Sequence, residues 1–150
     1  ITGFTTGATG DILKIDISDS TANALTGIVA AGDGSTAIAG DLVIKTMTAG
    51  TGITLAATDE IVVISGTLAN SAALIASIGT GAGIITKSAA NTTTNGLLVA
   101  WSDGTNTHVS SVADAGADAA MTSADLSVID IAVLAGVLTG FNTVNFTAIA

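Results

Sequence analysis

The side chains best suited to chemistry in this 150-residue sequence are four aspartates toward its C-terminal end. Asp114, Asp118 and Asp125 fall in one Ala-rich stretch, and Asp103 falls in a nearby predicted turn. Calcium takes six to eight oxygen ligands, which a loop of carboxylates and backbone carbonyls can supply. The spacing of these residues matches no EF-hand, so solvated loop charge is the alternative to a calcium site. A second acidic group, Asp11, Asp33 and Asp41, is a weaker candidate because each suits a strand start or a turn.

The only histidine, His108, lies beside Trp101 in a predicted hairpin. Nucleophilic catalysis would need a nucleophile and an orienting carboxylate in reach of it. Ser110, Ser111 and Asp103 are near in sequence, but no G-x-S-x-G motif frames them. A histidine across from a tryptophan is typical of cross-strand packing, so we expect a structural role and no enzyme activity.

The glycine-rich run Gly79–Gly83 and the three lysines give no anion site. A phosphate-binding loop follows a strand and opens a helix, whereas this run follows a predicted helix and suits its C-terminal end. Lys14, Lys45 and Lys87 each lie in a strand pattern, on the polar side where that side can be told. Lysine on a strand discourages edge-to-edge pairing, which is the interpretation favoured here.

Composition excludes several classes of protein. Ala, Thr, Gly and Ser make up 82 of the 150 residues, and 12 acidic residues face 3 lysines for a net charge of -9. Without a basic cluster a nucleic-acid partner is not expected, and without Cys there is no disulfide or thiolate metal site. No apolar run approaches the length of a membrane span, so no membrane insertion is expected. The start at Ile1 predicts a processed product or a fragment, without an N-terminal signal peptide.

The elements that must position these residues are mostly strands. Apolar and polar residues alternate in Asp11–Ser18, and Ile61–Ile64 is an unbroken apolar run that suits a strand covered on both faces. Asp103-Gly104 supplies the turn residues of a hairpin. A single helix is predicted over Leu68–Ile78, with its N-cap in Ser65–Thr67. Further strands are predicted at Asp41–Met47, Gly52–Ala56, Ile84–Ser88, Leu97–Ser102, Thr107–Ala113 and Leu126–Val137.

The sequence therefore predicts one all-β domain over residues 1–150, sandwich- or roll-like, with one short helix near residues 67–78. Its core would be Ile, Val and Leu with Ala and Thr as filler between closely packed sheets. The last segment, Thr143–Ala150, can complete its own sheet or add to the sheet of another subunit. The same alternatives hold for Ile1–Phe4, a second predicted terminal strand.

Two segments resemble parts of type I-secreted RTX proteins. Residues 1–18, I-T-G-F-T-T-G-A-T-G-D-I-L-K-I-D-I-S, resemble the segment that follows the calcium repeats of that family. Residues 97–150, with L-L-V-A-W-S-D-G-T-N-T-H-V and D-L-S-V-I-D-I-A-V-L-A-G-V, resemble C-terminal modules of such proteins, including bacterial surface-layer proteins. The chain has no G-G-x-G-x-D repeat, so the resemblance implies the non-repeat terminal module, exported by a type I route.

We expect from these features an extracellular structural protein at the cell surface. It would assemble with copies of itself into a surface layer or filament, by β-strand addition and with calcium screening its acidic faces. The alternative is a calcium-dependent adhesin or carbohydrate-binding module, for which Trp101 is the only aromatic beside the acidic stretch.

Overall fold

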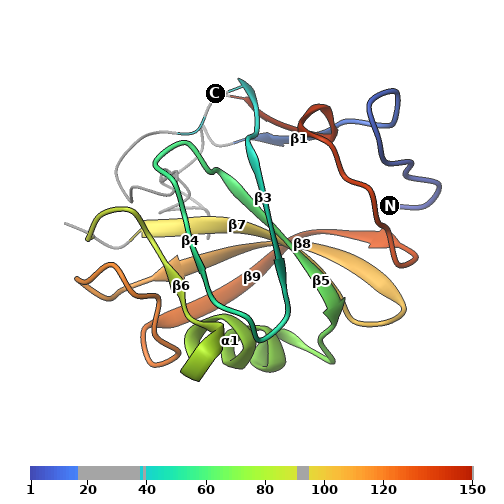
Figure 1. Ribbon diagram of the computed structural model, residues 1–150. Coiled ribbons are helices and arrows are strands. Elements are labelled where there is room, and N and C mark those ends of the chain that lie inside the picture. Colours follow the sequence, from blue (N-terminus) through green and yellow to red (C-terminus); the bar gives the residue numbers. More distant parts are fainter. Residues whose placement is uncertain (17–37, 39, 91–94, 150) are drawn as a thin grey trace.

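The computed structural model describes residues 1–16, 38, 40–90 and 95–149, and these residues are mostly β with one short α-helix (Figure 1). The predicted all-β, sandwich-like fold is confirmed. Asp33, a member of the second acidic group, lies outside the described residues. No helix in the described part of the chain is both long and apolar enough to cross a membrane.

A five-stranded sheet forms the middle of the molecule. Its first three strands are parallel to one another, and the last two continue it as antiparallel neighbours. In spatial order the strands are β3 (Ile44–Thr48), β5 (Ile61–Thr67), β7 (Asn95–Ser102), β8 (Asn106–Asp114) and β9 (Leu126–Ala135). β3 and β9 are therefore its two edges.

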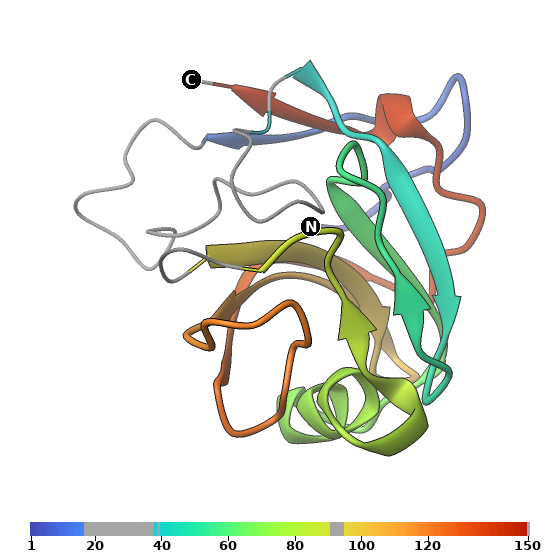
Figure 2. The ribbon, with the colours of Figure 1, turned by 60° about the vertical axis from the view of Figure 1, so that its left-hand side comes forward.

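Both faces of this sheet are covered, as Figure 2 shows. One face packs against the helix α1 (Ser71–Gly79) and the two-stranded sheet of β4 (Ile53–Thr54) and β6 (Ile85–Thr86). The other packs against a three-stranded sheet in the order β1 (Leu13–Asp16), β10 (Phe146–Ile149), β2 (Gly40–Asp41).

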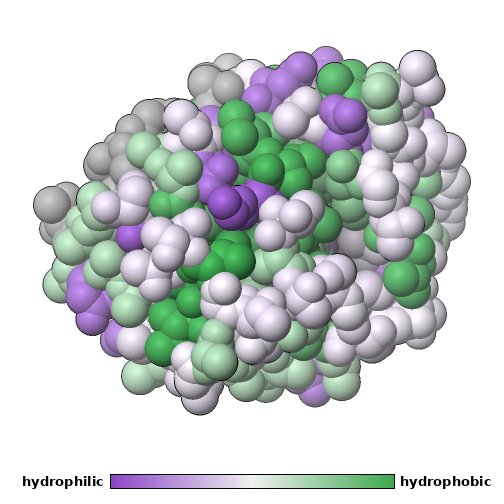
Figure 3. Space-filling model, in the orientation of Figure 1, coloured by the Kyte–Doolittle hydropathy of each residue, from purple (hydrophilic) through white to green (hydrophobic). Residues whose placement is uncertain are grey.

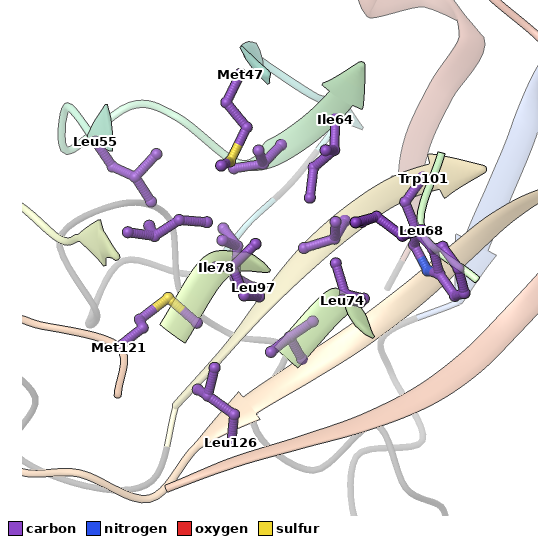
Figure 4. Close-up of a cluster of buried hydrophobic side chains, with 14 residues drawn as sticks. Met47, Leu55, Ile64, Leu68, Leu74, Ile78, Leu97, Trp101, Met121 and Leu126 are labelled. Carbon is purple, nitrogen blue, oxygen red and sulfur yellow. The ribbon is translucent and has the colours of Figure 1, made fainter. Parts of the chain in front are cut away.

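The alternation of side chains along the central strands explains this layering. Val62 and Ile64 of β5 point into the core beside α1, while Ile61 points into the core beside β10. β7 divides in the same way, with Leu97, Val99 and Trp101 on the helix side (Figure 4). A strand buried on both faces needs an unbroken apolar run, so the prediction for Ile61–Ile64 is confirmed.

The helix begins later than its pattern predicts. Asn70, not a residue of Ser65–Thr67, is the N-cap, and its side chain accepts a hydrogen bond from the Ala73 N–H at 2.9 Å. Ser65–Thr67 instead continues β5, and the Leu68 N–H donates to the Ser102 carbonyl at 2.8 Å. Ser65–Thr67, which the capping pattern assigns to the start of the helix, thus belongs to a strand that pairs with β7.

The two ends of the chain behave differently from each other. β10 lies between β1 and β2 of the same chain, so the last strand completes its own sheet. Ile1–Phe4 forms no strand, because Gly3 adopts a φ of 75° and Phe4 turns into the core. Of these four residues, Ile1 pairs along the outer edge of β9, donating to the Val133 carbonyl and accepting from the Ala135 N–H, both at 2.7 Å.

Apolar side chains also reach the surface. On the face seen in Figure 3, hydrophobic residues emerge among weakly polar ones, and strongly hydrophilic residues are few. Large hydrophobic side chains reach solvent at both ends of the chain and along β9, where Ile129 is 45% and Val133 39% exposed. Single exposed apolar residues are ordinary on a protein surface, whereas several on one strand can mark a contact surface.

Candidate functional site

Charged groups gather at the two opposite ends of β8. The His108 cluster lies at the end next to the β7–β8 turn, and the Lys87–Asp114 pair lies at the other end. Members of the His108 cluster come from three neighbouring strands and the turn: Trp101, Asp103, His108, Ser110 and Asp130.

The His108 ring stacks on Trp101 across the hairpin. The two residues are direct cross-strand partners, with ring centroids 4.3 Å apart and an interplanar angle of 17°. The predicted hairpin with Asp103-Gly104 in its turn is confirmed, and so is the cross-strand packing of His108 on Trp101. Trp101 is only 3% exposed, so this ring has no free face for stacking on a sugar, and the carbohydrate-binding alternative loses its aromatic contact.

Both nitrogens of His108 face carboxylates. Nδ1 lies 2.8 Å from Oδ2 of Asp130, and Nε2 lies 3.2 Å from Oδ2 of Asp103. Burial lowers the pKa of His108, but the hydrogen bonds and negative charges of Asp130 and Asp103 outweigh it and raise the pKa above 6.5. The doubly protonated ring suits this position, because only then does each nitrogen donate to its carboxylate.

The serine of the cluster is arranged for packing rather than attack. Trp101 Nε1 donates to Ser110 Oγ at 2.8 Å, and Ser110 Oγ donates in turn to Oδ1 of Asp130 at 2.6 Å. The Ser110 hydroxyl therefore donates its hydrogen bond to a carboxylate and not to His108. Ser110 is also fully buried. A nucleophilic serine needs its base within reach and a substrate approach, so this geometry differs from a Ser–His arrangement.

Asp103 fixes the turn that brings the cluster together. Its carboxylate accepts from the backbone N–H groups of Asn106 at 2.6 Å and Thr105 at 2.7 Å. These two bonds, with that to His108, lower the pKa of Asp103 to about 2. Gly104 follows with a φ of 94°, a conformation that an L side chain rarely adopts.

The Lys87–Asp114 pair is buried. Lys87 directly follows β6, Asp114 ends β8, and their side chains are 5% and 1% exposed. The Gly116 N–H donates to Oδ1 of Asp114 at 3.0 Å, while Lys87 Nζ contacts Oδ2. The expectation that Lys87 lies on a polar face is wrong, because residues 119–121 pair with residues 85–87 and cover it.

The structure separates the four aspartates of the predicted calcium site. Asp103 contacts His108, and Asp114 lies six residues further along β8 than His108, a span of roughly 20 Å in an extended strand. Asp103 therefore cannot share an ion with Asp114. Asp118 is exposed in the loop after β8, and Asp125 accepts from the Thr122 hydroxyl at 2.6 Å.

Only Asp114 and Asp125 approach each other. A Cβ built on Gly116 would lie 3.1 Å from Oδ1 of Asp114 and 3.2 Å from Oδ2 of Asp125, so the absence of a side chain at Gly116 leaves room for both. Across the described residues, no three Asp, Glu, His or Cys side chains converge in a way that could hold a metal. Calcium binding by these aspartates therefore stays a prediction. The structure does not bring the four predicted ligands together.

The two described members of the second acidic group, Asp11 and Asp41, have separate partners. Asp11 accepts from the N–H and hydroxyl of Thr5, and Asp41 accepts from the Thr147 hydroxyl at 2.8 Å. These bonds to Thr5 lower the pKa of Asp11. Asp11 thus accepts within the loop before β1, and Asp41 accepts across the pairing of β2 with β10.

Sequence reasoning missed two members of these clusters. Asp130 is the single charge in the apolar run of β9, and Lys87 is a single charge at the end of a short apolar segment. An isolated charge in an apolar run is a signal that a partner lies across the sheet, since an unpaired buried charge is costly.

The chain matches no protein-family model, no curated protein and no solved structure. The resemblance of residues 1–18 and 97–150 to modules of RTX and surface-layer proteins therefore stays a prediction.

Proposed function

We propose that this chain is an extracellular structural protein that assembles with copies of itself into a surface layer or filament. The observation that carries the proposal is the exposed outer edge of β9. A long, apolar edge strand presents unpaired backbone groups to a second chain, and proteins that avoid such pairing protect the edge with Lys, Pro or a covering segment.

In the part of the chain that the structure describes, β9 has little of this protection. Its ten residues include no Lys and no Pro, and its single charge, Asp130, is held by His108 and Ser110. Among the described residues, Ile1 is the only backbone hydrogen-bond partner on the outer edge, at Val133 and Ala135. The remainder of the edge carries the exposed Ile129 side chain. Both main-chain bonds and apolar contacts are thus available to a second copy.

The directions of the strands favour an open polymer. β3, β5, β7 and β9 all run the same way, since β9 is antiparallel to β8 and β8 is antiparallel to β7. The edge β9 of one copy can therefore pair in parallel with the edge β3 of the next, as neighbouring strands within the sheet do. Such a head-to-tail contact uses two different surfaces and does not close on itself unless the rotation between copies completes a ring.

Net charge opposes this assembly and gives calcium a role. A charge of -9 on each copy causes mutual repulsion, which a divalent cation lowers by screening and bridging acidic faces. In this proposal calcium acts between molecules at the cell surface. Residues 1–18 and 97–150 support the same location through their resemblance to exported surface proteins.

A pair of isoleucine substitutions tests the β9 edge. Ile129→Lys places a charge on the exposed edge, and Ile12→Lys makes the same change at a residue that is 53% exposed just before β1. We expect the unaltered chain with calcium to form filaments or sheets as its concentration rises. Ile129→Lys should raise the required concentration at least about tenfold, the effect of roughly 1.4 kcal/mol, and Ile12→Lys should leave it unchanged.

Sedimentation and electron microscopy measure this outcome, with a chelator added to parallel samples. A chain that stays monomeric at high concentration with calcium would overturn the proposal. A discrete dimer that Ile129→Lys dissociates would retain the β9 contact and contradict the filament. Equal effects of the two substitutions would exclude β9 as the contact.

A further inference from the structure

Lys87 and Asp114 are placed for a reaction as well as for an ion pair. Their side-chain atoms are in contact, Lys87 Nζ on Oδ2 of Asp114, and both side chains are almost wholly buried. The other oxygen of Asp114, Oδ1, accepts from the Gly116 N–H at 3.0 Å. An amine, a carboxyl group and a hydrogen-bond donor on the carboxyl oxygen are the components of amide formation.

Backbone structure holds the two residues in place from both sides. The Lys87 N–H donates to the Ala119 carbonyl at 2.9 Å, and Asp114 pairs in register with Leu126 of β9. Holding two reacting groups in contact replaces a bimolecular encounter and is worth many powers of ten in effective concentration. Burial also keeps out bulk water, which would favour hydrolysis of the amide product.

We propose that Lys87 and Asp114 become joined by an intramolecular isopeptide bond. In the buried pair the Lys87 ammonium passes one proton to Oδ2 of Asp114, which gives a neutral amine and a neutral carboxylic acid. Such neutralisation is the usual response of charges removed from water. The Nζ lone pair then attacks Cγ of Asp114 to form a tetrahedral intermediate.

The geometry assigns a role to each oxygen of Asp114. Oδ1 takes the developing negative charge and is stabilised by the Gly116 N–H, in the manner of an oxyanion hole. Oδ2 receives a second proton from Nζ and leaves as water when the C–O bond breaks. Of the three ammonium hydrogens, one remains on the amide nitrogen and two leave with Oδ2, so no outside reactant is required.

Gly116 has a positioning role in this reaction. A Cβ at this position would lie 3.1 Å from Oδ1 of Asp114, closer than most real contacts, so a side chain would displace the carboxyl group or the donor. The product would cross-link the segment after β6 to the end of β8 in a chain that has no cysteine with which to form a disulfide.

Intact mass and tryptic mapping of the full chain test the proposal. The mass should be lower than that of the sequence by one water. With no Arg and no Pro, trypsin can cut the unfolded chain only after Lys14, Lys45 and Lys87. Acylated Lys87 resists trypsin, so residues 46–150 should appear as one peptide. Cleavage before Asp103, which lies between the two joined residues, should leave both pieces connected.

The controls separate this bond from other losses of water. A succinimide at Asp103-Gly104 also lowers the mass, but it is reversed by mild alkali and leaves Lys87 open to trypsin. Asp114→Ala should restore the full mass of its own sequence and cleavage after Lys87, and Gly116→Val should reduce the cross-linked fraction at least severalfold. Full mass together with complete cleavage after Lys87 in the unaltered chain would overturn the proposal, whether or not the variants fold.

Discussion

The two ends of β8 hold the same kinds of groups in opposite environments. At one end the imidazole of His108 lies between Asp103 and Asp130 with partial access to solvent. At the other end Lys87 meets Asp114 with almost none. Solvent lets the first cluster gain or lose a proton while the chain stays folded. The second pair must stay matched, neutralise or react, because a lone charge there has no water to solvate it.

This difference shows that burial, more than the identity of the charged residues, decides what an ion pair does for the fold. Stability at the Lys87–Asp114 end should depend on both partners being present, whereas stability at the His108 end should depend on pH. Substitutions at the two ends of β8 are therefore expected to change stability in different ways.

The largest effect is expected at the Lys87–Asp114 pair. Lys87→Met or Asp114→Leu leaves the other charge buried without its partner, and each should lower the free energy of unfolding by about 3–5 kcal/mol. The double variant removes both charges and should be more stable than either single variant. Urea unfolding at neutral pH measures all three, and a double variant less stable than both singles would contradict a buried, matched pair.

An intermediate effect is expected where the His108 cluster enters the core. Ser110→Ala leaves the Trp101 Nε1–H without its acceptor and should cost about 1–3 kcal/mol, since both residues are buried. Ser127→Ala, on the exposed side of β9, is the matched control and should change stability by less than about 0.5 kcal/mol. If the two serine variants unfold at the same urea concentration, the hydrogen bond from Trp101 to Ser110 contributes no more to stability than an exposed serine does.

Much of the sheet could be predicted from the sequence because its signals are local. The apolar run Ile61–Ile64 shows burial on both faces, and Asp103-Gly104 specifies a hairpin whatever the remainder of the chain does. The start of α1 was misplaced because the pairing of Leu68 with Ser102 is non-local. Sequence spacing carries no information about that contact.

The candidate site was harder to predict for the same reason. Asp103 and Asp114 are near in sequence, but an extended strand places them far apart, so nearness along the chain misled the calcium prediction. Lys87 and Asp130 have partners 27 and 22 residues away, supplied by strand pairing and by the loop that covers β6. The pairing of β8 with β9 brings Asp130 to His108, whereas Lys87, directly after β6, and Asp114, in β8, belong to different sheets and meet only through the packing of one sheet on the other.

The smallest effect is the pH dependence of the His108 end. The pKa of His108 is raised in the folded chain relative to the ordinary value of 6.5, so protonation of His108 stabilises the fold. This contribution is complete below pH 6.5 and is lost as the pH rises through the raised pKa. The loss should be on the order of 1 kcal/mol or less, because Asp130 is partly solvated.

His108→Gln keeps a hydrogen-bonding side chain but cannot titrate, so its unfolding should lose this pH dependence. Urea unfolding from pH 6 upward measures the stability, and the His108 ring resonances give its protonation directly. Lys87→Met should keep the same dependence, because its site lies at the other end of β8. A histidine that titrates below 6.5 would mean that burial outweighs the two carboxylates and that both ends of β8 obey the same rule. A pH dependence that survives His108→Gln would assign the effect to another group and contradict the role of His108.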